Sequence, residues 1–225
     1  MRGQQEFTSS GTFIPGAGVT SVMAEMWGGG GGGGCGGDGN NGQSGTSERG
    51  GGGGGGGSGG SWQRAVIPVT PGATYTVTVG AAGHTCVFRV SGNQAATAGG
   101  STSFSGPGIS PYAVPGGAPG TDGGSLSSNT SQGGAAGTGG LPDGAGFSGD
   151  GVKEGGSPGE NGNAGSGAAY PSGGCGFFGR GGAARSGSVD GHHGYGGSGG
   201  YGGCVVGPPQ DAYLDVRDGY LLLNW

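Results

Sequence analysis

The side chains that could carry out chemistry in this chain are few and far apart. A glycosidase needs two carboxylates facing each other on a rigid frame, and no acidic pair in this sequence is favoured for that role. The single lysine, Lys153, lies outside a phosphate-binding loop motif, and no G-x-G-x-x-G string joins a strand to a helix. Isolated acidic residues in the glycine-rich stretches are expected to be solubilising surface: Asp38, Asp122, Asp143, Asp150, Glu154, Glu160 and Asp190. The pattern predicts a protein that is not an enzyme and holds no cofactor.

The histidines and cysteines also lack the spacing of metal ligands. His192 and His193 lie where glycine recurs every third residue. In a helix with three residues per turn, the side chains of adjacent residues point about 120° apart. We therefore expect no metal there, and a solvated surface or a receptor contact stays open. The four cysteines form no C-x-x-C pair: Cys35, Cys86, Cys175 and Cys204. They are expected to be reduced and buried, with a disulfide such as Cys175 to Cys204 as the alternative.

Several apolar side chains in glycine-rich surroundings are candidates for recognition. Aromatic anchors on rigid loops are what binding surfaces use. The candidates for receptor or partner contact, with the two histidines included, are Ile109, Tyr112, Val114, Phe177, Phe178, His192, His193, Tyr195 and Tyr201. The alternative is that the apolar ones fill gaps between chain segments or cap the edge of a sheet, and Phe177 and Phe178 in particular could pack inward.

The composition excludes whole classes of protein. Glycine supplies 71 of 225 residues, whereas the usual share is about 7%. A collagen helix is excluded because the G-X-Y repeat is broken and only 12 residues are proline. The net charge of -5 and the scattered Lys and Arg argue against nucleic acid as a partner. No apolar stretch reaches about 18 residues and the N-terminus lacks an apolar signal region, so we expect neither membrane insertion nor Sec-type export.

Alternating β-branched and aromatic residues predict strands mostly near the two ends of the chain. The main candidates cover residues 19–27, 62–69, 74–79 and 213–225, and shorter ones cover 86–90 and 101–104. The run Tyr220-Leu221-Leu222-Leu223 indicates a strand buried on both faces. No helical periodicity occurs. The predicted fold class is all-β, with a small β-sandwich formed by the N- and C-terminal segments.

The glycines between these strands recur with a period of three. Gly117, Gly120 and Gly123 form one such series, and a longer one runs from Gly191 to Gly203. Three residues per turn is the period of a polyproline II helix, which makes no internal hydrogen bonds and must bond to neighbours. A glycine stripe lets two backbones approach closely. The runs at residues 28–34 and 50–57 carry extra glycines and are expected inside a bundle of such helices.

We therefore expect one glycine-rich domain over residues 1–225. Sandwich strands are predicted within residues 1–27, 62–104 and 205–225. The insertions at residues 28–61 and 105–204 are predicted to form polyglycine II helices, which the sandwich supports. Ordering each glycine costs about 1–2 kcal/mol in backbone entropy while a hydrogen bond returns about 1, so one helix cannot be stable alone.

The order of the non-glycine motifs resembles the glycine-rich domain of bacteriophage tail proteins. The opening motif spans residues 7–22 and leads through Met26-Trp27 into a glycine run. Later motifs follow in order at residues 69–80, 100–104 and 218–225, so the resemblance covers nearly the whole chain. It implies a non-enzymatic component of the virion near the host-facing end of the tail, such as a tail fibre tip, minor tail protein or adhesin. About six residues precede the opening motif, so a fibre shaft would be another chain.

The resemblance also implies partners and a place of assembly. Related polyglycine II adhesins present receptor-binding loops at the far end of the helix stack. Other tail proteins and a glycan or protein receptor on the host surface are the expected partners, and a homo-oligomer is expected. Phage proteins assemble in the host cytoplasm and leave by lysis, which fits the missing export signal. The alternatives are a purely structural minor tail or decoration subunit and, less favoured, an ice-binding or cell-surface protein.

Overall fold

The computed structural model describes residues 3–37, 52–87, 94–124, 146–156, 159, 161 and 216–225. Within these ranges the chain forms strands and no helix, and every pairing between strands is antiparallel. The strands are β1 (Gln4–Phe7), β2 (Gly11–Phe13), β3 (Ser21–Trp27), β4 (Trp62–Pro68), β5 (Tyr75–Thr78), β6 (Thr102–Ser105), β7 (Tyr112–Val114), β8 (Val152–Glu154) and β9 (Tyr220–Asn224). The prediction of an all-β chain is confirmed.

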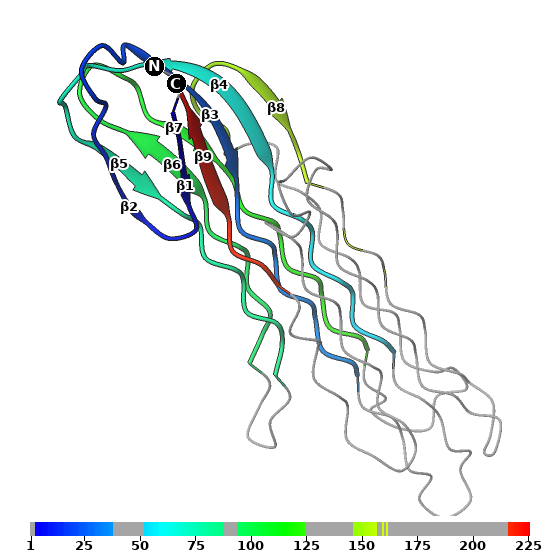
Figure 1. The fold of residues 1–225 in the computed structure, drawn as a ribbon. Coiled ribbons are helices and arrows are strands. Elements are labelled where there is room, and N and C mark those ends of the chain that lie inside the picture. Colours follow the sequence, from blue (N-terminus) through cyan, green and yellow to red (C-terminus); the bar gives the residue numbers. More distant parts are fainter. Residues whose placement is uncertain are drawn as a thin grey trace, which may run out of the picture.

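Two sheets lie at one end of the molecule (Figure 1). The larger has the order β1-β9-β3-β4-β8 and the smaller the order β2-β5-β6-β7. Both contribute to one hydrophobic core, in which Met26, Ile67 and Leu221 of the larger sheet and Phe104 of the smaller are fully buried. A second cluster, on the opposite face of the larger sheet, consists of Trp27, Trp62, Tyr220 and Leu222.

The predicted strands match the observed ones where the alternation is long. The segments expected at 19–27, 62–69, 74–79 and 101–104 correspond to β3, β4, β5 and β6, and all four residues of 220–223 are buried in β9 as expected. Two strands, β7 and β8, fall within the predicted insertion 105–204. The segment 80–101, predicted as part of the sandwich, instead leaves the sheets; its described residues form no strand, and Val87 and Gln94 make an isolated bridge.

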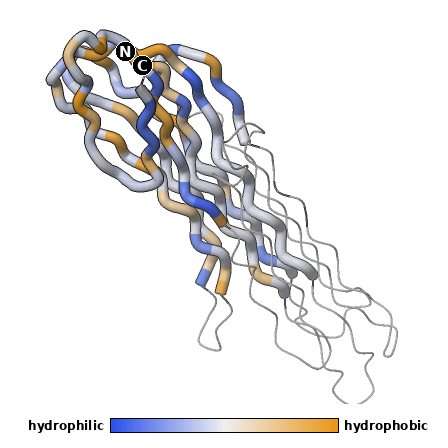
Figure 2. The backbone as a smooth tube through the Cα atoms, in the orientation of Figure 1, coloured by the Kyte–Doolittle hydropathy of each residue, from blue (hydrophilic) through white to orange (hydrophobic). Residues whose placement is uncertain are grey.

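Extended segments run side by side away from the sheets (Figure 1). We call them tracks, and six of them cover residues 28–37, 52–61, 80–87, 94–101, 115–124 and 216–219, each continuing a strand. Figure 2 shows that hydrophobic and hydrophilic residues alternate in the sheets, whereas the tracks are mostly pale. Every residue of tracks 28–37 and 52–61 is buried, so the predicted interior position of these glycine runs is confirmed for their described residues.

Main-chain hydrogen bonds join the tracks at every third residue. The amides of residues 28, 31, 34 and 37 donate to the carbonyls of residues 61, 58, 55 and 52 at 2.8–3.0 Å. The same spacing recurs where Gly117, Gly120 and Gly123 donate to residues 29, 32 and 35. Track 28–37, the central track, also donates to tracks 94–101 and 216–219 and accepts from track 80–87. It therefore bonds to five neighbouring tracks.

Glycine is required where the tracks meet. A Cβ atom on Gly31 would overlap the carbonyl of Ala118, and one on Gly32 would overlap that of His84. The period-three series Gly117, Gly120 and Gly123 meets the carbonyls of Ser58, Gly55 and Gly52 in the same way. No side chain could occupy these positions without moving a backbone, so the glycine stripe predicted from the sequence is the contact surface between tracks.

The junction between sheets and tracks is held by a buried hydroxyl. Thr102 of β6 is fully buried, and its Oγ1 donates to the Trp27 carbonyl at 2.6 Å. The same oxygen accepts from the Gly80 amide at 3.0 Å. Three residues further on, Gly83 donates directly to the Gly30 carbonyl. Thr102 thus supplies the first link of this series.

Candidate functional site

Three of the predicted contact residues lie in the described part of the chain. Tyr112 and Val114 are buried core residues of β7, and Ile109 is partly buried against the same core. The expectation that these side chains are available for recognition is wrong for Tyr112 and Val114, because the loop before them returns to the smaller sheet. The other candidates lie outside the described residues: Phe177, Phe178, His192, His193, Tyr195 and Tyr201.

Exposed apolar residues do occur among the described residues: Ile14, which follows β2, and two valines on the larger sheet. Val66 is 70% and Val152 61% exposed, and they lie diagonally across the β4–β8 pair. Arg64 lies beside them, with its Nε 3.5 Å from a Glu25 carboxylate oxygen and its Nη2 2.9 Å from the Met23 sulfur. The alternation in β4 already put Val66 on the face opposite Ala65 and Ile67, so its exposure could have been inferred from the sequence.

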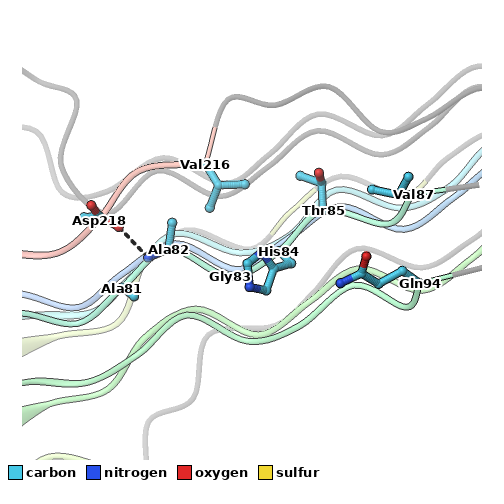
Figure 3. Close-up of a pocket in the computed structure, with 9 residues that line it drawn as sticks. All are labelled: Ala81, Ala82, Gly83, His84, Thr85, Val87, Gln94, Val216 and Asp218. Carbon is cyan, nitrogen blue, oxygen red and sulfur yellow. Dashed lines mark hydrogen bonds between the residues drawn. The ribbon is translucent and has the colours of Figure 1, made fainter.

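A surface groove of about 410 Å³ lies along the flank of three tracks, 80–87, 94–101 and 216–219 (Figure 3). Its apolar lining comes from alanine and valine side chains, and its polar groups are the exposed side chains of His84, Gln94 and Asp218. Asp218 is fixed because its Oδ1 accepts from the Ala82 amide at 2.7 Å. The complete lining consists of Ala81, Ala82, Gly83, His84, Thr85, Val87, Gln94, Val216 and Asp218.

The groove presents groups that can contact a ligand. Its imidazole, amide and carboxylate groups offer both donors and acceptors of hydrogen bonds. A volume of this order accommodates a small ligand or a short segment of a larger one. This groove could not be predicted from the sequence, because its residues come from segments more than a hundred positions apart and none of them belongs to a recognisable motif.

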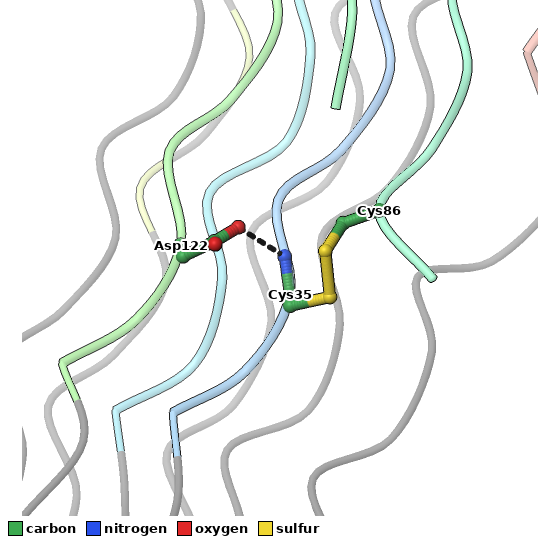
Figure 4. The surroundings of a disulfide bond; sticks show 3 residues. All are labelled: Cys35, Cys86 and Asp122. Carbon is green, nitrogen blue, oxygen red and sulfur yellow. Dashed lines mark hydrogen bonds between the residues drawn. A yellow bond between two sulfur atoms is a disulfide. The ribbon is translucent and has the colours of Figure 1, made fainter. Parts of the chain in front are cut away.

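A disulfide joins the central track to its neighbour (Figure 4). Cys35 and Cys86 are bonded, with their Cα atoms 5.2 Å apart, and both are fully buried. The expectation of reduced cysteines is wrong for this pair, because the packing of tracks brings together residues that are 51 positions apart. Cys175 and Cys204, named as the example of a bridge, lie outside the described residues. Asp122 adjoins the pair, and its Oδ1 accepts from the Cys35 amide at 2.8 Å.

Comparison with known proteins adds no relative. No protein-family model matches this chain, and no curated protein matches its sequence. Among the described residues there is no helix that could cross a membrane. What the chain does must therefore be argued from its own residues.

Proposed function

We propose that this chain is a non-enzymatic structural protein of a bacteriophage virion, located at the host-facing end of the tail and acting as an adhesin. The observation that carries the proposal is the central track, whose glycines bond to five neighbouring tracks at every third residue. Such a bundle is a rigid support with almost no reactive side chains. Its architecture suits a stiff projection that carries a binding surface away from the particle.

We assign the tracks as polyglycine II helices and the two sheets as a β-sandwich. The three-residue repeat of hydrogen bonds supports the first assignment, because three residues per turn is the period of this helix. The hydrophobic core shared by both sheets supports the second. The motifs at residues 7–22 and 218–225, which resemble the phage tail domain, lie in the sheet region that anchors the tracks.

The orientation that we propose takes the sheet end, where the described ends of the chain lie, as the attachment end. Gly3 and Trp225 exchange both main-chain hydrogen bonds, beside the pair β1–β9 (Figure 1). The sheet end would then face the other tail proteins, and the far ends of the tracks would face the host. The groove beside His84 and Asp218 lies on the flank between these ends and offers a further surface for a glycan or protein receptor.

A structural subunit without receptor contact is the second candidate. The exposed Val66 and Val152 favour it, since contiguous exposed apolar side chains mark sites of protein–protein contact. A homo-oligomer packed through this face would leave them covered.

Binding to host cells distinguishes the two. Purified folded protein is expected to bind cells of the phage's host and to reduce infection by the intact phage in a dose-dependent way. The variant Val66→Asp, which introduces a charge, is the matched control, because it alters the sheet face and leaves the tracks unchanged. Folded protein that neither binds nor competes would refute the adhesin role, and a loss of oligomers in the Val66→Asp variant would then support the structural one.

A further inference from the structure

The disulfide occupies a special place in the packing of tracks. Gly29 and Gly32 face the carbonyls of Ala81 and His84 so closely that neither could carry a Cβ. Three residues further along the central track the series is broken by Cys35, which carries a side chain toward the same neighbour and bonds to Cys86. The close backbone contact is thus replaced at this level by a side-chain link.

A carboxylate completes the group. The amides of Gly31 and Gly34 donate to main-chain carbonyls, but that of Cys35 donates to the Asp122 side chain. Asp122 comes from a third track, 115–124, and Figure 4 shows its side chain pointing toward Cys35. The two sulfur atoms and a carboxylate oxygen all lie within 4.8 Å of one another. Three tracks therefore contribute one potential ligand atom each to a single point.

We propose that, when the disulfide is reduced, Cys35, Cys86 and Asp122 bind a thiophilic divalent cation of the Zn²⁺ class. Two thiolates and one carboxylate are ligands that Zn²⁺ accepts, and water can take the fourth position of a tetrahedral site. Both cysteines are buried, and a cation offsets the cost of burying their thiolates. The exposed Asp122 gives the cation a route from solvent.

The zinc-bound dithiolate and the metal-free disulfide interconvert with all atoms and electrons accounted for. Two thiols and one Zn²⁺ give a dithiolate complex and two protons, so binding strengthens as the pH rises. A small-molecule disulfide then oxidises the complex. It takes two electrons and two protons to become two small thiols, while the protein sulfurs join and Zn²⁺ leaves. The three tracks remain tied at this point in either redox state.

Cobalt substitution provides the test. Reduced protein under anaerobic conditions is expected to bind one Co²⁺ per chain with a thiolate-to-cobalt charge-transfer band, and oxidised protein is expected to show no such band. Displacement by Zn²⁺ should remove the band. Adding oxidised glutathione to the zinc complex should release one Zn²⁺ for each pair of thiols lost.

Matched variants locate the site. Cys35→Ser and Cys86→Ser should each abolish the band, while a Cys175→Ser/Cys204→Ser variant should keep it. Asp122→Asn retains an oxygen for the Cys35 amide but is a poor ligand, so cobalt affinity should fall roughly tenfold or more. Asp150→Asn, another exposed carboxylate, should have no effect.

Three results would overturn the proposal. The first is the absence of the thiolate-to-cobalt band in reduced protein that circular dichroism shows to be folded. The second is a band that survives in Cys35→Ser, and the third is an Asp122→Asn variant with wild-type affinity. If reduction alone unfolds the protein, Zn²⁺ must restore the fold, and a failure to do so is equally decisive against it.

Discussion

Replacing Gly32 by alanine tests the packing of the tracks most directly. Gly32 donates its amide proton to Thr97 and accepts from the Gly120 amide, both at 2.9 Å. The added Cβ would overlap the His84 carbonyl oxygen, which itself accepts from Thr97 at 2.9 Å. The methyl group can be accommodated only if the backbones separate, and separation weakens all three hydrogen bonds.

The cost can be worked out from these bonds. Each contributes about 1 kcal/mol, and a buried group left without a partner costs about 1–3 kcal/mol. Alanine returns only about 0.4–1 kcal/mol by restricting the unfolded chain. We therefore expect Gly32→Ala to lower the free energy of unfolding by about 3 kcal/mol, which is roughly 6–12 °C in Tm for a chain of this length.

Gly16→Ala is the matched control. No atom lies within 4 Å of a Cβ placed on Gly16, and its φ is not in the left-handed region. Its stability should stay within about 1 kcal/mol of wild type or rise slightly. Guanidinium denaturation followed by tryptophan fluorescence gives both values, because Trp27 and Trp62 adjoin the tracks. If Gly32→Ala is as stable as Gly16→Ala, the close packing of the central track is refuted.

Three further substitutions test other parts of the same frame. Thr102→Val should lower the free energy of unfolding by about 2–4 kcal/mol, because two buried main-chain groups lose their partner. Thr102→Ser keeps the hydroxyl and should recover most of this stability. Equal free energies of unfolding in the two variants would contradict the bridging role. Gln63→Leu removes the buried side-chain amide that donates to the carbonyls of residues 148 and 150, so hydrogen exchange at the Ser148 main-chain amide should accelerate selectively. Unchanged exchange would show that the Gln63 side chain does not hold this loop in place. The double variant Cys35→Ser/Cys86→Ser should lose about 4 kcal/mol by chain entropy over a separation of 51 residues, and the loss should match that of reduced wild type in denaturation without metal.

The strands that the sequence analysis found are those with enough alternation to be recognised alone. β3 and β4 have seven residues each and pair over their full length, so their apolar faces stand out. β1 reads Gln-Gln-Glu-Phe, with three exposed residues, and its identity as a strand depends on pairing with β9 at the other end of the chain. β7 and β8 have three residues each, too few for a period of two to emerge from a glycine-rich background.

The candidate sites were predicted less well than the fold for a related reason. The period of three identified which glycines touch a neighbour, as Gly117 and Gly120 show, but it does not say which track the neighbour is. The Cys35–Cys86 bond depends on that information, since it joins two tracks that leave different sheets. Tyr112 and Val114 were misjudged because a short strand between proline-rich turns was interpreted as a loop, although both follow the alternation of β7.

The order of strands in the two sheets explains how a glycine bundle can be stable at all. β9, β3 and β4 are neighbours in the larger sheet, and the tracks that continue them, 216–219, 28–37 and 52–61, are neighbours as well. The tracks from the smaller sheet, 80–87, 94–101 and 115–124, keep their order too, so five tracks form a chain of bonded neighbours around the central one. The pairing of Trp27 with Trp62 continues directly as the bond from Gly28 to Ser61. Each track therefore starts with its register already fixed by the sheets, and each further hydrogen bond orders only three more residues. Because the sheets fix the register, a substitution that unfolds them should release the tracks in the same transition.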